Sequence, residues 1–62
     1  MPFKLTNITD KRTAYINLNC VQFIEKNEDN NMAILTMANG EIFNTNEDYN
    51  ELIKEWGIIN CL

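Results

Sequence analysis

The chain has 62 residues, enough for one small domain over residues 1–62, and a chain this short buries only about 60% of the surface that it exposes when unfolded. Nine acidic residues against five basic ones give a net charge of −4, which argues against a nucleic-acid partner, because such binding rests on Lys and Arg neutralising phosphates. The absence of histidine and of a Cys-x-x-Cys pair argues against the usual zinc sites and removes the commonest general base of enzymes.

Two β-rich runs are predicted at the start of the chain. Residues 3–6 alternate apolar and polar side chains, and turn-type residues at positions 9–12 separate them from a second strand at residues 13–18. Alternation along this second strand places Tyr15 on the face opposite Ile16.

A third β-rich run, residues 20–25, follows directly and is interpreted either as a separate strand or as a bulged continuation of the second. Alternation places Val21 and Phe23 on one face and Ile24 on the other. The next segment, residues 26–31, is polar throughout and predicts a hairpin loop.

A second hairpin is predicted in the middle of the chain. Residues 32–37 form a strand, and residues 41–44 return antiparallel to it. Between them lies Asn39-Gly40, the dipeptide that a two-residue type I′ turn prefers, because both central residues of that turn need a positive φ.

A helix is predicted from Asn46 to Trp56. Thr45 or Asn46 is expected to cap its first turn, and Gly57 is expected to end it in left-handed backbone, so that Ile58 folds back onto the helix. One face of the helix is apolar, with side chains at the 3.6-residue period: Tyr49, Leu52, Ile53 and Trp56. The elements together predict an α+β fold, an antiparallel β-sheet of four to five short strands with one C-terminal α-helix packed on one face.

Groups that could carry chemistry are few. Cys20 and Cys61 are expected to stay reduced, since two cysteines in a core-forming chain do not resemble a secreted disulfide framework, and Cys20 is expected to be a buried small hydrophobic residue. The segment Asp29-Asn30-Asn31 lacks the alternating ligands and distal Glu of a calcium loop. We therefore expect no catalytic residue, no cofactor and no metal site.

Three acidic residues, Glu47, Glu51 and Glu55, recur every four positions and form an acidic strip on the predicted helix, away from its apolar stripe. Like charges at this spacing destabilise a helix by roughly 0.2–0.5 kcal/mol per pair. The strip is interpreted either as a solvated face or as a docking surface for a basic partner.

The predicted sheet carries more apolar side chains than one helix can cover. The side chains expected to face the helix are Ile16, Leu18, Val21, Phe23, Leu35 and Met37. The opposite face then carries candidate interface residues, namely Tyr15, Ile24, Ile34 and Phe43, with Ile42 as the alternative to Phe43. A symmetric homodimer would cover this face with its own copy. The alternative is a curled, barrel-like sheet whose second face is partly covered by the C-terminal residues 58–62.

The start of the chain lacks the apolar region of a signal peptide, and nowhere do eighteen apolar residues run together. We therefore expect a cytoplasmic protein without a membrane segment. Abundant Asn, Ile and Lys suggest an AT-rich bacterial or phage genome.

The order of several short motifs resembles a known family. The motifs are Ile16-Asn17-Leu18-Asn19, Phe23-Ile24-Glu25, Leu35-Thr36, Asn39-Gly40 and Asn46-Glu47-Asp48-Tyr49-Asn50-Glu51-Leu52-Ile53. In this arrangement the chain resembles the small FlbD-type proteins of bacterial flagellar operons and similar short proteins of Gram-positive bacteria and their phages. The resemblance implies a non-enzymatic accessory role, with no catalytic residues to carry over.

The sequence predicts a small, non-enzymatic cytoplasmic protein that acts through protein contacts and self-associates. A first alternative is a phage or mobile-element protein that binds and modulates a host protein through its acidic surface. A second alternative, disfavoured by the acidic charge, is a nucleic-acid-binding β-domain that uses Tyr15, Phe23 and Phe43.

Overall fold

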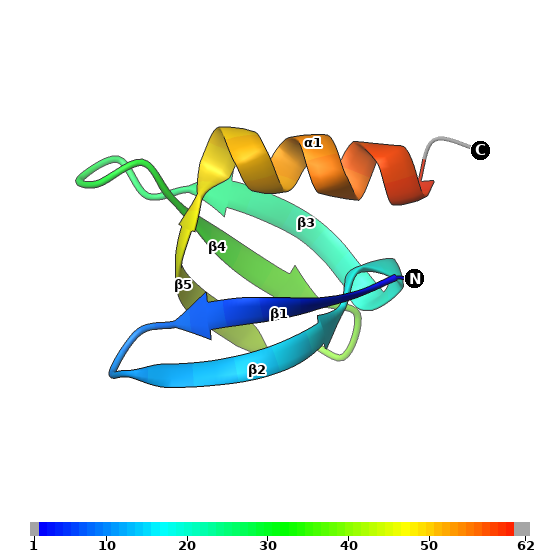
Figure 1. Cartoon of the computed structure of the whole chain (residues 1–62), viewed down its shortest axis with the longest axis horizontal. Coiled ribbons are helices and arrows are strands. Elements are labelled where there is room, and N and C mark those ends of the chain that lie inside the picture. Colours follow the sequence, from blue (N-terminus) through cyan, green and yellow to red (C-terminus); the bar gives the residue numbers. More distant parts are fainter. Residues whose placement is uncertain (1, 61–62) are drawn as a thin grey trace.

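The computed structural model describes the backbone of residues 2–60 and the side chains of residues 2–58. Within these residues the elements are β1 (Phe3–Ile8), β2 (Arg12–Asn17), the 3₁₀ turn η1 (Leu18–Cys20), β3 (Val21–Lys26), β4 (Met32–Met37), β5 (Ile42–Asp48) and α1 (Tyr49–Asn60). The strands form one antiparallel sheet in the order β2-β1-β5-β4-β3, and α1 lies across it (Figure 1). The prediction of an antiparallel sheet with one C-terminal helix is confirmed.

The sheet bends sharply between β1 and β5. These strands pair only at Ile8 and Thr45, next to a bond from the Thr9 N–H to the Asn44 carbonyl at 3.0 Å, whereas β1 and β2 pair along their whole length. The β1–β2 hairpin therefore forms one leaf of the sheet and β3, β4 and β5 form the other (Figure 1). The curl agrees with one part of the alternative architecture predicted from the sequence. Its other part, a cover by residues 58–62, lies outside the described side chains except at Ile58, which is exposed.

The core lies between the leaves of the sheet and the helix. Its buried members are Ile16, Leu18, Val21, Ile24, Ala33, Leu35 and Leu52. Helix α1 contributes Leu52, which is fully buried, and packs against η1, β3, β4 and β5. Trp56 joins the helix to η1, because its indole N–H donates to the Leu18 carbonyl at 3.2 Å. Full burial of a side chain such as Leu52 contributes about 1.5–3 kcal/mol.

Strand β3 differs from its prediction because it contains a β-bulge. The pairing with β4 shifts between Val21 and Phe23, so Gln22 is an extra residue on β3. A single extra residue reverses the alternation beyond it. Consequently Val21 and Ile24 both point into the core, while Phe23 points outward and is 45% exposed. The predicted faces of Phe23 and Ile24 are therefore wrong.

The turn between β4 and β5 has three residues rather than two. Met37 and Glu41 close it through a bond from the Met37 N–H to the Glu41 carbonyl, and the Gly40 N–H donates to the Met37 carbonyl. Within this turn Gly40 alone has a positive φ, at 90°, while Asn39 accepts the Glu41 N–H on its side-chain oxygen. This is a type I turn followed by a left-handed glycine, and the predicted type I′ turn is wrong.

Helix α1 begins and ends later than predicted. Strand β5 runs through Asp48, whose carboxylate accepts the Glu51 N–H at 3.1 Å and so caps the first turn. Gly57 lies inside the helix without a positive φ, and Ile58 is exposed instead of folding back. The predicted cap and the predicted helix end are both wrong. The apolar stripe is confirmed, since Leu52 is buried and its neighbours on that face pack against the core.

No helix within residues 2–60 is both long enough and apolar enough to cross a membrane.

Candidate interaction surface

Strand β1 points Lys4 and Thr6 inward together with Ile8, and points the large apolar side chains of Phe3 and Leu5 outward. Ile8, only 2% exposed, fixes this orientation, because residues two and four positions away from it must share its face. Thr6 is therefore fully buried, and its hydroxyl donates to the Lys4 carbonyl at 2.9 Å. By the same alternation Phe3 and Leu5 point outward, 51% and 55% exposed.

The inward Lys4 has a partner on the helix. Its ammonium lies 3.2 Å from the Glu55 carboxylate, which links β1 to α1. Both side chains are partly exposed, so the ion pair contributes about 0–1 kcal/mol.

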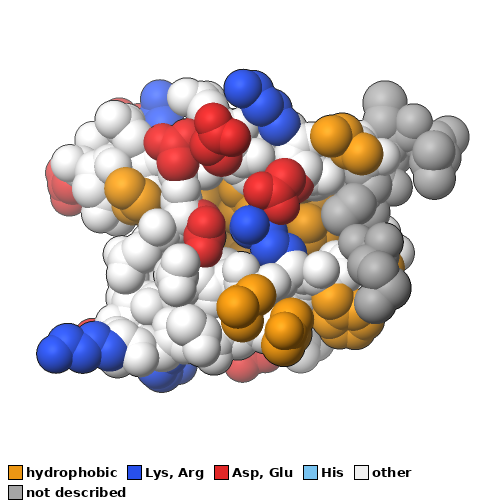
Figure 2. Space-filling model, in the orientation of Figure 1, with side chains coloured by type: hydrophobic (Ala, Val, Ile, Leu, Met, Phe, Trp, Pro, Cys, Tyr) orange, Lys and Arg blue, Asp and Glu red, His pale blue; other side chains and the backbone are white. Residues whose placement is uncertain are grey.

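Strand β2 adds a third apolar side chain to the outer face of the hairpin. Tyr15 is directly opposite Leu5 in the pairing of β1 with β2 and is 72% exposed. We call Phe3, Leu5 and Tyr15 the hairpin patch. Figure 2 shows hydrophobic side chains gathered over these two strands, in the lower half of the view, while acidic side chains gather higher up.

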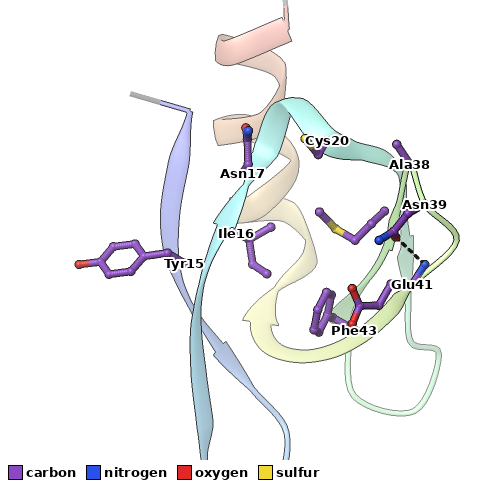
Figure 3. Close-up of a pocket in the computed structure, with 9 residues that line it drawn as sticks. Tyr15, Ile16, Asn17, Cys20, Ala38, Asn39, Glu41 and Phe43 are labelled. Atoms are coloured by element: carbon purple, nitrogen blue, oxygen red, sulfur yellow. Dashed lines mark hydrogen bonds between the residues drawn. The ribbon is translucent and has the colours of Figure 1, made fainter.

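A groove borders β2 on the side away from β1. It has a volume of about 350 Å³ and lies between β2 and the turn that joins β4 to β5. Ile16 and Phe43 point into it, while Tyr15 points away from it (Figure 3). Cys20 also lines the groove and is exposed, so the prediction that it is buried is wrong. The second cysteine, Cys61, lies outside the described residues.

The four predicted interface residues do not share one surface. Tyr15 is exposed on the hairpin, and Ile34 is half-buried on the outer side of β4. Ile24 is buried in the core because of the bulge in β3, so its place on the exposed face is corrected. Phe43 is half-buried against the core, and its neighbour Ile42 is the one that points outward.

Phe3 and Leu5 were not among the predicted interface residues. The alternation of residues 3–6 places them on one face, but an apolar face of a strand is ordinarily assigned to the core. Ile8 reverses this assignment. It is an odd number of positions away from Phe3 and Leu5, so its side chain lies on the opposite face of the strand, and that face is the buried one.

The predicted acidic strip is divided between two elements. Glu47 belongs to β5 and not to the helix, and its carboxylate accepts the Asn7 N–H at 2.7 Å where β1 and β5 separate. Only Glu51 and Glu55 lie on α1, and Glu55 faces Lys4. The placement of all three on one helix is wrong.

The aromatic residues considered for nucleic-acid binding are also dispersed. Tyr15 lies on the outer face of the hairpin, Phe23 on the outer face of the other leaf and Phe43 against the core. A stacking platform needs aromatic rings side by side on one basic face. The three rings do not supply one.

Comparisons with protein-family models, with curated proteins and with solved structures found no match to this chain. The resemblance to FlbD-type proteins therefore stays a prediction. Within residues 2–60, no three acidic or cysteine side chains gather as a metal ion would require. The most distinctive surface feature of the described chain is the hairpin patch beside the groove.

Proposed function

We propose that the protein is a small, non-enzymatic interaction protein that self-associates through the hairpin patch. The observation that carries this proposal is the orientation of β1, which exposes Phe3 and Leu5 while it buries Thr6. A solvated sheet face ordinarily has the reverse arrangement, polar side chains outward and apolar ones inward. Adjacent exposed apolar side chains mark an interaction surface. The accessory role implied by the resemblance to FlbD-type proteins is compatible with this function.

A second copy of the chain is the occupant we assign to the hairpin patch. A two-fold arrangement places the patch of each copy beside the patch of the other and needs no other partner. If about half of each Tyr15 side chain becomes newly buried where the two patches meet, the two side chains contribute on the order of 1.5–3 kcal/mol. The cost of association is larger, roughly 4–15 kcal/mol, so we expect burial of these side chains alone to be insufficient for a stable dimer.

The groove supports a non-enzymatic role. Its ionisable lining residues are Tyr15, Cys20 and Glu41, and the chain has no histidine to activate a thiol or to transfer a proton. Nucleophilic catalysis needs a nucleophile and a base within hydrogen-bond reach, with a group that orients the base. Ile16 and Phe43 give the groove an apolar floor instead (Figure 3).

Size-exclusion chromatography with light scattering tests the proposal through matched variants. Leu5→Thr and Tyr15→Thr keep β-forming residues but remove the apolar patch, and each is expected to weaken self-association at least tenfold. Ile42→Thr is the control, because Ile42 is 61% exposed on the other leaf of the sheet. A wild-type monomer at every concentration would refute the proposal. An effect of Ile42→Thr equal to that of Leu5→Thr would refute the assignment to the hairpin patch.

A further inference from the structure

We infer that two copies of the protein pair along the free edge of β2, antiparallel, with Tyr15 of each copy at the two-fold axis. The pairing would join the two sheets into one continuous sheet. This inference rests on the proposed self-association and adds the edge, the register and the hydrogen bonds that specify it.

The backbone of β2 leaves one set of hydrogen-bonding groups unused. Just beyond the end of β2 the Leu18 N–H donates to the Pro2 carbonyl at 2.9 Å. This bond shows which residues of β2 turn their backbone groups toward β1 and which turn them away. Bonded and non-bonded positions alternate along an antiparallel strand. The even-numbered residues of β2 therefore bond to β1, and the N–H groups of Thr13, Tyr15 and Asn17 turn to the free edge, together with the carbonyls of Thr13 and Tyr15. The Asn17 carbonyl is at the N-cap of η1 and accepts the first bond of that turn. Within the described chain β2 pairs with no other strand.

The two edge strands of the sheet differ in how they are protected. Strand β3, at the opposite edge, carries Glu25 and Lys26 and is distorted by the bulge at Gln22. Charged residues and bulges are the devices by which proteins prevent an edge from pairing with another chain. From Thr13 to Asn17, β2 has no charge, no proline and no bulge. Of the two edges, β2 is the one left open to pairing.

The strand β2 is self-complementary in one particular register. With Tyr15 opposite Tyr15 of the second copy, Thr13 of each copy lies opposite Asn17 of the other. The Tyr15 N–H of each copy then meets the Tyr15 carbonyl of the other, and each Asn17 N–H meets a Thr13 carbonyl, which gives four hydrogen bonds to free carbonyls. Each Thr13 N–H lies opposite an Asn17 carbonyl that already accepts a bond within η1. A register centred on Ala14 would leave the edge groups of Asn17 outside the paired segment. We therefore assign the register centred on Tyr15.

The hairpin patch continues across this axis. Leu5 lies opposite Tyr15 within each copy, so the register lines up Leu5 and Tyr15 of one copy with Tyr15 and Leu5 of the other in a single apolar row. The only charged residue of β2 is Arg12. The two Arg12 residues would lie about 20 Å apart, six residues along the strand direction, well beyond the screening length at physiological salt.

The groove supplies room beside the edge. It lies along β2 opposite the turn at residues 38–41, and its inner wall includes Ile16 and Phe43. An incoming strand at β2 would border this groove and narrow its opening, which removes apolar side chains from water in addition to those of the patch (Figure 3). Backbone pairing and apolar burial thus act at the same place.

Engineered disulfides test the register directly. In a background with Cys20→Ser and Cys61→Ser, the double variant Thr13→Cys/Asn17→Cys places each new cysteine opposite its counterpart in the second copy, at the Cα separation of about 5.5 Å that a disulfide accepts. Within one chain the two positions are about 14 Å apart, too far to bond. Mild oxidation should therefore convert the double variant to a covalent dimer at least tenfold faster than either single variant.

Amide hydrogen exchange of the wild-type protein gives a second readout that needs no substitution. The Tyr15 N–H is unbonded in the monomer and bonded in the proposed dimer, so its exchange should slow at least tenfold as the protein concentration rises. The Ala14 N–H, which faces β1, is the internal control and should change far less.

The outcomes separate this inference from the function on which it rests. A wild-type dimer whose Tyr15 amide stays unprotected, or a double variant that crosslinks no faster than the single variants, would overturn β2 pairing and leave self-association standing. Fast crosslinking of Thr13→Cys alone would overturn the register. A wild-type protein that stays monomeric would overturn both proposals.

Discussion

Leu5 of β1 lies directly opposite Tyr15 of β2 on the outer face of the hairpin, and both side chains are more than half exposed. A cross-strand pair of this kind stabilises a sheet by about 0.2–1 kcal/mol, but it covers only one side of each residue. The pair is exposed because Ile8 is buried in the core. Side chains alternate along a strand, so the burial of Ile8 turns Leu5, three positions away, to the outer face. The same residue that anchors β1 in the core therefore creates the proposed interaction surface.

The proposed dimer should become tighter as salt is added. The interface is apolar, and the net charge of −4 on each copy opposes association at low ionic strength. We expect the dissociation constant to fall when NaCl is raised from about 0.05 to about 0.5 M, because screening weakens the repulsion between like-charged copies. Fluorescence anisotropy of a labelled chain measures this. A dissociation constant that rises with salt would indicate instead that acidic and basic patches hold the copies together.

Gly57 and Gly40 should respond in opposite directions to alanine. Gly57 is inside α1 with nothing within 4 Å of an added Cβ, so Gly57→Ala should stabilise the protein by about 0.5–1 kcal/mol. Gly40 has a φ of 90°, so Gly40→Ala should destabilise it by about 1–2 kcal/mol. Urea denaturation followed by circular dichroism measures both. Destabilisation by Gly57→Ala would mean that the helix ends at Gly57 in left-handed backbone.

Asp48 should be the residue that caps α1. Its carboxylate accepts the Glu51 N–H, so Asp48→Ala should cost about 1 kcal/mol of unfolding free energy. Asn46→Ala is the matched control, because Asn46 lies within β5 and is exposed. We expect it to change stability by less than about 0.5 kcal/mol. A larger effect at Asn46 than at Asp48 would place the start of the helix where the sequence pattern predicted it.

The hydroxyl of Thr45 should stabilise the junction between β4 and β5. This side chain is 3% exposed, and its hydroxyl donates to the Ala33 carbonyl at 2.7 Å while accepting the Glu47 N–H at 3.2 Å. Thr45→Val keeps the shape but removes both bonds, so it should cost about 1–2 kcal/mol in thermal or urea unfolding. Thr45→Ser keeps the hydroxyl and should cost less. The reverse order would show that the methyl group is the important part of this side chain.

Periodicity predicted most of the fold. The strand at residues 32–37 and the apolar face of the helix followed from alternation and from the 3.6-residue period, both of which report burial along a single element. The errors occur where one residue changes the phase of an element. The extra residue Gln22 in β3 reversed the faces of Phe23 and Ile24, and no feature of the sequence marks it as a bulge.

Local capping preferences misplaced the ends of the helix for a related reason. Thr45 is a good capping residue, but tertiary pairing keeps it in β5, where its hydroxyl bonds to Ala33. Gly57 is a good helix terminator, but the helix continues through it. Capping propensities are worth about 1 kcal/mol, which strand pairing and core packing readily exceed.

The proposed interaction surface was predicted only at Tyr15. Alternation placed Tyr15 opposite the buried Ile16, and the structure agrees. Phe3 and Leu5 could not be assigned, because the sequence does not show which face of β1 is buried. That depends on how the whole sheet packs, and the buried face is the one that carries Thr6 and Ile8. A free strand edge such as that of β2 is likewise a property of sheet order, which a single sequence does not state.

Sedimentation equilibrium of the wild-type protein across a wide concentration range tests self-association most directly. The chain has a mass of 7.2 kDa. We predict that the weight-average mass rises with concentration and levels off at twice that value, and that Leu5→Thr shifts the transition to at least tenfold higher concentration. A mass that stays at 7.2 kDa up to millimolar concentration would contradict the proposal that the hairpin patch binds a second copy.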